Sequence, residues 1–439
     1  MIRLVTMLKE SAFFKNIIIV MSGTALAQVI GYAMSPIISR LFTPAEFGVF
    51  GSFNAIAGVI AAGVTLEYTQ AIMLPKEKED AINLLAAAIL STGFISFLAL
   101  LFCLLVPGKA NNLMKTQGVW ALAMLVIATL ISGLNSAFQA WAVRVKAFKQ
   151  TSASQVVRSV SSNGSRIIFG SLKMGAVGLV ISNILANIMA SINVSRVFFS
   201  EFPALRSSIS WPKIKHLAAE YRDFPMYSAS QNIINALSSG LPVLLLTRFY
   251  DISVAGAYAF GVSILQVPMG FVLTALRQVL FQKASESQHQ GKSLASLYIR
   301  TTTVLFFMAL IPSIVLIIWA PQIFTVIFGA RWRLAGELAR SLIIWMAVVF
   351  CNLPAVLFAR IIRVQRFIFF YDIGLLAMRA LTLVLGGIYL NVYQTVFLFA
   401  VVGAGMNAFL ILKVGNLVIK REGRADMSSI KGYFFGDRN

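Results

Sequence analysis

The chain has 439 residues, of which 58% are hydrophobic and only 12% are charged, and its mean hydropathy is +0.82. Because a soluble domain carries about 25% charged residues, this composition excludes a soluble fold and indicates an integral membrane protein. The net charge of +21 would suggest a nucleic-acid partner in a soluble protein, but basic cytoplasmic loops produce the same excess in a membrane protein.

The apolar residues form long continuous runs, which favour membrane-spanning helices of about 20 residues over the alternating strands of a barrel. The first run, from Ile17 to about Ile38, is too long for the core of a cleavable signal, so we expect it to be the first span. Twelve spans are predicted in chain order, at residues 17–39, 46–74, 81–106, 118–142, 151–170, 176–199, 224–248, 255–281, 297–320, 336–359, 367–390 and 394–418.

One long, charged connection divides these spans into two sets of six. The predicted organisation is an N-terminal half at 1–199, a cytoplasmic linker at 200–223, a C-terminal half at 224–419 and a cytoplasmic tail at 420–439. With the N-terminus in the cytoplasm, most loop lysines and arginines fall on the inner side, so we expect both termini to be cytoplasmic. Most of the positive charge then reflects topology, and we expect no nucleic-acid partner.

The segment at 151–170 is the most polar of the predicted spans and could instead lie on the membrane surface as an interfacial helix. Removing it would place the basic linker outside and reverse the orientation of every later span. We therefore favour a spanning helix.

A short stretch after the first span recurs after the seventh. At an offset of 208 residues, the correspondences are Arg40 with Arg248, Gly48 with Gly256, Phe50 with Tyr258 and Gln70 with Gln278. Each copy lies at the junction of the first two spans of its half. This pattern predicts a duplication that gives two parallel halves related by an axis along the membrane normal.

Small residues in two spans indicate close helix packing. The first span carries Gly23, Ala27 and Gly31, and the sixth carries Gly178, Ser182, Ala186 and Ala190. Such ladders let neighbouring helix backbones approach each other.

The fifth span carries one polar face at helical spacing, made by Thr151, Ser154, Gln155, Arg158, Ser161, Ser162, Ser165 and Arg166. A polar face at membrane depth must meet protein or a water-filled cavity, because an arginine there is costly unless it is paired or hydrated. We predict that Arg158 and Arg166 line an interior cavity. The alternative is that these arginines reach an interface or form structural ion pairs.

The second half offers Arg277 in the eighth span and Arg379 in the eleventh, the latter on the same side as Asp372. We expect the four arginines to make a central cationic cavity between the halves, because the guanidinium fork binds phosphate in a bidentate manner. Glu67 and Asp372 are the candidates for ion pairing or for coupling to a proton or sodium gradient.

The remaining pair, Arg40 and Arg248, is predicted to lie at the outer mouth, in equivalent positions of the two halves. The junction that contains Arg40 is interpreted as a hinge-like corner, since Pro44 separates the first two spans.

Several chemistries find no support in the sequence. Cys103 and Cys351 lie in apolar runs, and the two histidines lie in polar loops far from other metal ligands, so we expect neither a disulfide nor a metal site. A phosphate-binding loop and the common hydrolase motifs do not occur. We therefore predict a protein that is not an enzyme and that uses no cofactor.

The stretch "ISRLFTPAEFGVFGSFNAIAGVIAAGVTLEYTQAIML" resembles the N-terminal signature of Wzx-type polysaccharide flippases, members of the multidrug/oligosaccharidyl-lipid/polysaccharide exporter superfamily. The matching positions are Ser39, Arg40, Leu41, Phe42, Thr43, Pro44, Glu46, Phe47 and Gly48. The twelve spans, the midpoint linker and the two parallel halves extend the similarity over the whole chain.

The resemblance implies an all-helical fold of the multidrug and toxin extrusion (MATE) type. It also implies movement of an undecaprenyl-diphosphate-linked oligosaccharide, an O-antigen or capsule repeat unit, from the cytoplasmic to the periplasmic leaflet of the bacterial inner membrane. The expected partners are this anionic lipid-linked substrate, membrane lipid, and the polymerase and glycosyltransferases of the same pathway. The alternative is a multidrug or organic-cation antiporter on the same fold, which would present acidic and aromatic groups to its substrate. A membrane-bound polymerase or ligase is disfavoured because the predicted outer loops are short.

Overall fold

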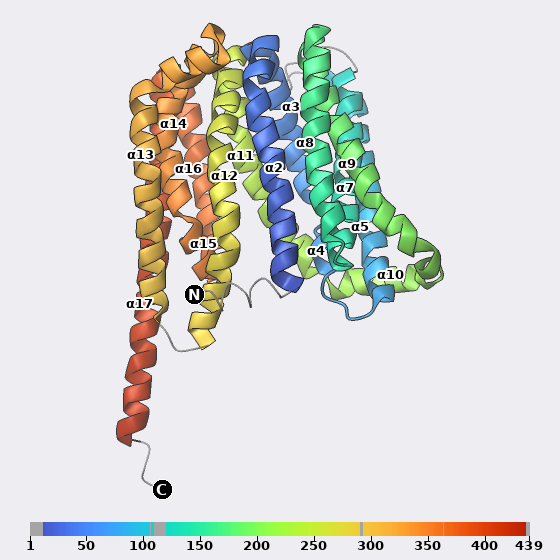
Figure 1. The fold of residues 1–439 in the computed structure, drawn as a ribbon, viewed down its shortest axis with the longest axis vertical. Coiled ribbons are helices and arrows are strands. Elements are labelled where there is room, and N and C mark those ends of the chain that lie inside the picture. The colour runs from blue at the N-terminus through green and yellow to red at the C-terminus, as the bar shows by residue number, and fades with distance from the viewer. Residues whose placement is uncertain (1–11, 106, 109–119, 290–292, 363, 436–439) are drawn as a thin grey trace. The chain divides into compact units, whose positions relative to one another are not determined.

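The structure is a computed structural model that describes residues 12–105, 107–108, 120–289, 293–362 and 364–435 (Figure 1). The first half of these residues forms α2 (Ala12–Leu41), α3 (Pro44–Gly63), α4 (Tyr68–Ala71), α5 (Lys78–Leu105), α7 (Trp120–Arg144), α8 (Phe148–Ser171), α9 (Gly175–Leu205) and α10 (Trp211–Glu220). The second half forms α11 (Ser230–Phe249), α12 (Ile252–His289), α13 (Leu294–Phe328), α14 (Arg333–Cys351), α15 (Leu353–Ile361), α16 (Gln365–Tyr389) and α17 (Val392–Phe435). Short helical turns lie at η1 (Arg206–Ser208), η2 (Phe224–Ala229) and η3 (Ala330–Trp332).

The predicted all-helical membrane fold is confirmed. Nine stretches of the described chain are long and apolar enough to cross a membrane, namely those at α3, α5, α7, α9, α12, α13, α14 with α15, α16 and α17. Helices α2, α8 and α11 occupy the three remaining predicted spans, so a helix lies at each of the twelve.

The chain forms two compact units. Unit 1 comprises Met1–Phe260 and Thr325–Trp332, and unit 2 comprises Gly261–Phe324 and Arg333–Asn439. Unit 1 therefore includes α11 and the start of α12 as well as the first six predicted spans. The predicted boundaries at 199 and 224 concern the duplicated halves, not these compact units, and they stay a prediction.

In unit 1, α2 and α8 run in the same direction and touch along most of their length. A Cβ atom on Gly23 would lie 1.9 Å from Ser152 Oγ, and Ser159 Oγ donates a hydrogen bond of 2.6 Å to the carbonyl of Ala27. The predicted small-residue ladder is thus the surface on which α8 packs. This lengthwise packing agrees with a spanning helix, and because α8 is not among the nine apolar stretches, its crossing of the membrane stays a prediction.

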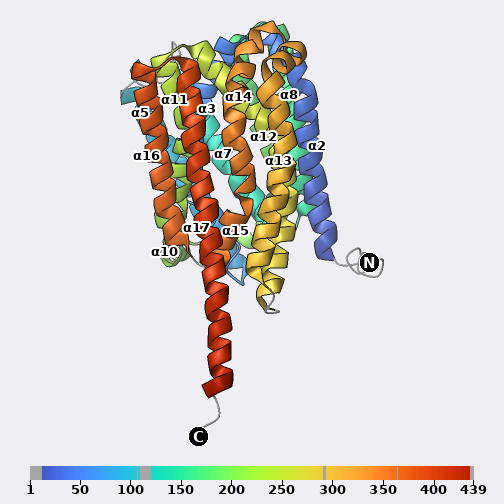
Figure 2. The ribbon, with the colours of Figure 1, turned by 90° about the vertical axis from the view of Figure 1, so that its left-hand side faces the viewer.

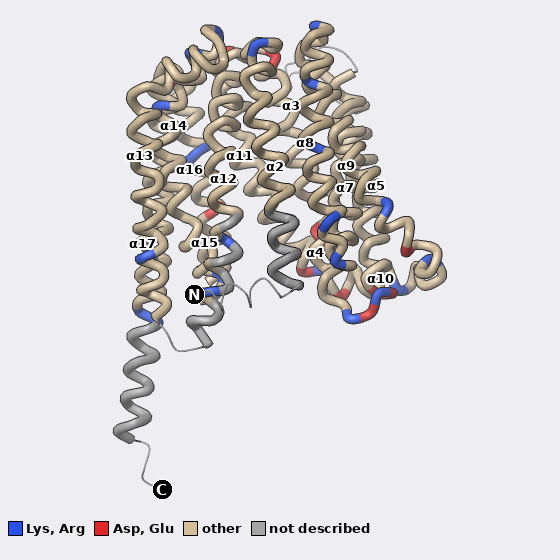
Figure 3. Tube along the Cα trace, viewed as in Figure 1, with Lys and Arg blue, Asp and Glu red and all other residues tan. Residues whose placement is uncertain are grey.

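Helix α10, from the predicted linker, instead lies across the ends of its neighbours in unit 1 (Figure 1). It is joined to α5 through Asn83, which donates to the carbonyl of Ser208 (2.9 Å) and accepts from the backbone N–H of Ser210 (3.1 Å). Charged residues gather at this end of unit 1, around α4 and α10 (Figure 3). The topology prediction places this end in the cytoplasm.

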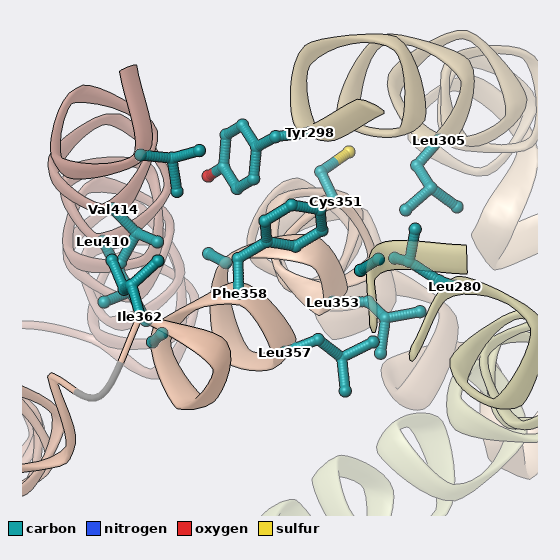
Figure 4. Close-up of a cluster of buried hydrophobic side chains, with 14 of the residues drawn as sticks. Leu280, Tyr298, Leu305, Cys351, Leu353, Leu357, Phe358, Ile362, Leu410 and Val414 are labelled. Atoms are coloured by element: carbon teal, nitrogen blue, oxygen red, sulfur yellow. The ribbon is translucent and has the colours of Figure 1, made fainter. Parts of the chain in front are cut away.

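In unit 2, α13, α14, α16 and α17 run along a common axis (Figure 2). Their shared core includes Tyr298, Phe358 and Val414 (Figure 4). The Tyr298 hydroxyl donates to the carbonyl of Ile411 (2.6 Å), so its one polar atom is satisfied inside the apolar core.

The signature stretch forms the corner between α2 and α3. Thr43 caps α3: its side chain accepts from the Glu46 N–H (3.3 Å), while the Glu46 carboxylate accepts from the Thr43 N–H (2.7 Å). Pro44 occupies the first turn, where its missing N–H has no consequence. A capping box of this kind satisfies backbone donors that the first helical turn leaves unpaired.

The two copies of the repeated corner contact each other within unit 1. A Cβ atom on Gly48 would lie 1.9 Å from the carbonyl oxygen of Ile252, and one on Gly256 would lie 1.8 Å from that of Pro44. Since Ile252 and Gly256 correspond to Pro44 and Gly48 at the 208-residue offset, the contact is reciprocal. The repeated glycines are therefore explained by a close crossing of the first turns of α3 and α12.

We expect Gly48→Ala and Gly256→Ala each to destabilise the protein, because the added methyl group overlaps backbone atoms that cannot move independently. The expected loss is about 1–3 kcal/mol, measured as a lower midpoint of thermal unfolding in detergent. Gly58→Ala is the matched control in the same helix, because nothing lies within 4 Å of its Cβ position. An equal effect of all three substitutions would contradict the close crossing.

Candidate functional site

Two arginines of α8 lie on the side of this helix that faces the interior of unit 1. The opposite side presents Val160 and Ile168, which are 52% and 60% exposed and suited to lipid. Arg158 is exposed, whereas Arg166 is half-buried and its Nε atom is fully covered.

Arg166 is held by an aromatic ring rather than by an acid. Its guanidinium carbon lies 5.3 Å from the centroid of Phe50, on α3. Within the described residues, no carboxylate forms a salt bridge with Arg158 or Arg166, and Arg166 Nε has no hydrogen-bond partner. A desolvated cation over a ring is stabilised by about 2 kcal/mol, and its positive charge is not neutralised.

Amide side chains connect the helices around this interior. Asn183 of α9 donates to Asn54 Oδ1 of α3 (3.2 Å), and Gln155 of α8 donates to Gln139 Oε1 of α7 (3.4 Å). Part of the predicted polar face has a packing role instead, since buried Ser154 donates to the carbonyl of Ala190 (2.9 Å). The predicted ladder of α9 is the surface that receives it.

In unit 2, Arg379 is buried and also lies over aromatic rings. Its guanidinium carbon is 4.9 Å from the Trp345 ring and 5.7 Å from the Phe399 ring. Asp372 belongs to the same helix, α16, and its pairing with Arg379 stays a prediction. Arg277, on α12, is exposed.

Glu67 differs from its expected role. The prediction of one continuous span over 46–74 is wrong: α3 ends at Gly63, and Leu66 and Glu67 adopt left-handed φ angles of 48° and 59°. The Glu67 carboxylate accepts hydrogen bonds from Asn232 Nδ2 (2.9 Å) and from Gln70. Among the described residues its partners are therefore amides, not the arginine that the sequence suggested.

Arg40 and Arg248 occupy the last turns of α2 and α11, and both are exposed. A cation at a helix C-terminus interacts favourably with the helix dipole. The equivalent positions agree with the repeat, and their place at the outer mouth stays a prediction. The side chain of Gln278 lies outside the described residues.

The sequence did not predict that Phe50 contacts Arg166 or that Asn54 binds Asn183. Phe50 was identified only as a position of the repeat. Helical spacing shows which residues share a face, but it does not show which face of another helix lies opposite. Within the described chain, no group of three or more His, Cys, Asp or Glu side chains could hold a metal ion.

Comparison with known families gives a match over most of the chain. The family described as "Polysaccharide biosynthesis protein" matches residues 37–336. The chain belongs to this family. Comparison with curated protein sequences returns no match.

Solved structures show the fold of this polysaccharide biosynthesis protein. An inward-facing multidrug resistance MATE family transporter of the MOP superfamily aligns with a TM-score of 0.71 at 12% identity, over 92% of this chain and 96% of the other. The lipid II flippase MurJ, in an inward closed conformation, aligns with a TM-score of 0.69 at 11% identity, over 92% of each chain. These two neighbours are a transporter and a flippase, and their likeness to this chain shows that it shares their fold.

We expect Arg166→Met to leave the thermal stability unchanged or to raise it. A buried cation without an acidic partner costs desolvation energy, and an apolar side chain of similar length removes that cost. The measurement is the midpoint of thermal unfolding in detergent, with and without lipid.

Arg144→Met is the matched control. Arg144 donates to the carbonyls of Met73 (3.1 Å), Pro75 and Lys76 (3.1 Å), so its loss should destabilise the protein by about 1.5–3 kcal/mol. If Arg166→Met lowers the midpoint as much as Arg144→Met, Arg166 has a structural role.

Proposed function

We propose that this protein is a flippase that moves an undecaprenyl-diphosphate-linked oligosaccharide, an O-antigen or capsule repeat unit, from the cytoplasmic to the periplasmic leaflet of the bacterial inner membrane. The observation that carries the proposal is the pair Arg158 and Arg166 in the interior of unit 1, without an acidic partner among the described residues. In a polysaccharide biosynthesis protein, such an arrangement suits an anionic head group.

The chemistry of arginine fits a diphosphate. Each guanidinium offers a planar fork of N–H donors that matches two phosphate oxygens, and it stays charged at any physiological pH. An eight-residue separation on one helix corresponds to about 12 Å along the axis. Two long side chains on one face can thus approach the two ends of an extended head group.

The path proposed for the substrate is alternating access. The head group enters from the cytoplasm and is held by Arg158 and Arg166, while its lipid tail remains in the bilayer. We expect Arg277 and Arg379 to add positive potential from the second half, and Glu67 and Asp372 remain the candidates for coupling to an ion gradient. Glycosyltransferases would supply the substrate and a polymerase would consume it.

A multidrug antiporter is the competing proposal, because the fold neighbours include multidrug MATE transporters. Organic cations require acidic or aromatic groups at the binding site. The interior of unit 1 presents two arginines, which would repel such cargo. The charge of the interior therefore favours the anionic substrate.

We expect Arg158→Ala and Arg166→Ala each to reduce surface polysaccharide in a bacterial strain that lacks its own flippase and depends on this protein. Loss of a charged hydrogen-bond donor costs about 1.5–3 kcal/mol, roughly ten- to a hundredfold in substrate binding. Arg166→Lys should retain part of the activity, since it keeps the charge and loses the fork.

Lys149→Ala is the control, because Lys149 is an exposed cation of the same helix that lies on the side opposite Arg158 and outside the predicted span. Protein levels in the membrane are measured in parallel. Full complementation by both alanine variants would overturn the cationic site. If the protein restored export of a cationic drug but not of polysaccharide, that result would favour the antiporter.

A further inference from the structure

A short strap of chain, Thr325–Trp332, belongs to unit 1 although both of its flanks belong to unit 2. The strap comprises the last turn of α13, Gly329 with a φ of +102°, and the turn η3. The chain thus leaves unit 2 at Phe324, contributes this strap to unit 1 and returns at Arg333. A change in the position of one unit relative to the other must either bend the ends of the strap or release it.

Trp332 anchors the strap to the signature corner. Its side chain is fully buried, and its indole Nε1 donates to the carbonyl of Ser39 (2.8 Å). The Ser39 hydroxyl proton is shared between the carbonyl of Pro36, in its own helix (2.9 Å), and the carbonyl of Phe328 (3.1 Å). The indole hydrogen bond and this shared hydroxyl hydrogen bond, running in opposite directions, join the strap to the end of α2.

Aromatic rings from two further elements pack against Trp332. The ring centroid of Phe260, on α12, lies 4.0 Å away, and that of Phe47, on α3, lies 5.1 Å away at an interplanar angle of 89°. Phe328 packs edge-on against Phe260 at 5.1 Å. One indole therefore contacts both helices that cross at Gly48 and Gly256.

The duplication does not repeat this arrangement. At the 208-residue offset, Ser39 corresponds to Thr247 and Phe47 corresponds to Ala255. The second copy of the corner therefore lacks the aromatic side chain on which Trp332 packs in the first copy. The strap adds an asymmetric contact to an otherwise reciprocal crossing.

We propose that the Thr325–Trp332 strap is a latch that holds the α3–α12 crossing closed, and that Trp332 leaves its site when this end of the protein opens during transport. The inference rests on the proposed function, because an alternating-access cycle requires this end to open. The attachment suits a reversible contact, because the hydrogen bonds and ring contacts of Trp332 and Ser39 can break and form again without any covalent change.

The first test measures opening without any substrate. Cys103 and Cys351 are replaced by Ala, and a single reporter cysteine is placed at Ser52, which is fully buried beside Thr247 (Oγ to Oγ1, 3.2 Å). Spheroplasts are then treated with a membrane-impermeant maleimide. Trp332→Ala should raise the labelling rate at least about tenfold, and Trp332→Phe, which loses mainly one hydrogen bond, should raise it about fivefold.

Trp141→Ala is the matched control, because Trp141 is equally buried in unit 1 but belongs to a different cluster, with Phe198. It should leave the labelling rate of the reporter unchanged. Unchanged labelling in both Trp332 variants would overturn the latch. An equal rise in Trp332→Ala and Trp141→Ala would also overturn it, since that result indicates general loosening.

The second test asks whether the crossing must open for transport. In the same cysteine-free background, Gly51→Cys is combined with Ala259→Cys. The two Cβ atoms lie 3.3 Å apart, close enough for the two sulfur atoms to form a disulfide. Oxidation should abolish polysaccharide export, and reduction should restore it. The control pair, Thr92→Cys with Gly133→Cys, joins α5 to α7 at a similar distance of 3.0 Å and should leave export intact.

Normal export by the oxidised Gly51–Ala259 pair would overturn the latch. The two proposals fail in different ways, because the labelling rates require no substrate. If the Trp332 variants raise the labelling rate as expected but no polysaccharide is exported under any condition, the proposed substrate is wrong and the latch proposal is supported.

Discussion

The close crossing of α3 and α12 constrains the rest of unit 1. At Gly48 and Gly256 each helix occupies the space in which the other would carry a side chain, so glycine is required at both positions. The crossing in turn positions two corners, between α2 and α3 and between α11 and α12. The signature residues around it have related structural roles: Thr43 and Glu46 cap α3, Phe47 packs on Trp332, and Ser39 binds the strap. The motif therefore has a packing role at this corner.

The same helix connects this crossing with the candidate site. Helix α3 begins at the corner and carries Phe50 and then Asn54, which contact Arg166 and Asn183. Since an α-helix transmits displacement along its axis with little bending, a rotation of α3 at the crossing also moves the ring beneath Arg166. In the proposed transport cycle, opening at the corner and binding of the head group would therefore be coupled through one element.

Much of this architecture follows from hydrophobic pattern and residue spacing. The runs of apolar residues located twelve helices, and the small residues of α2 and α9 marked real packing surfaces. The glycine echo predicted a duplication, but it did not show that the two copies touch, because spacing along one chain carries no information about contact between distant segments. The role of Trp332 could not be predicted for the same reason, because its partners Ser39, Phe47 and Phe260 are far away in the sequence. The break at Glu67 was missed because apolar residues continue on both sides of it, and its partner Asn232 lies on the distant helix α11.

The aromatic partners of the arginines bear on what the protein can carry. Both Arg166 and Arg379 lie over rings, of Phe50 in one unit and of Trp345 and Phe399 in the other. A ring attracts the guanidinium through its quadrupole, which carries no net charge, so the positive charge of the site is preserved. A carboxylate in the place of Phe50 would hold Arg166 more firmly, but it would also occupy the N–H fork and compete with phosphate. In the proposed site, Arg166 is held by a ring and therefore remains open to an anion, whereas transport of organic cations would need the opposite choice of side chains.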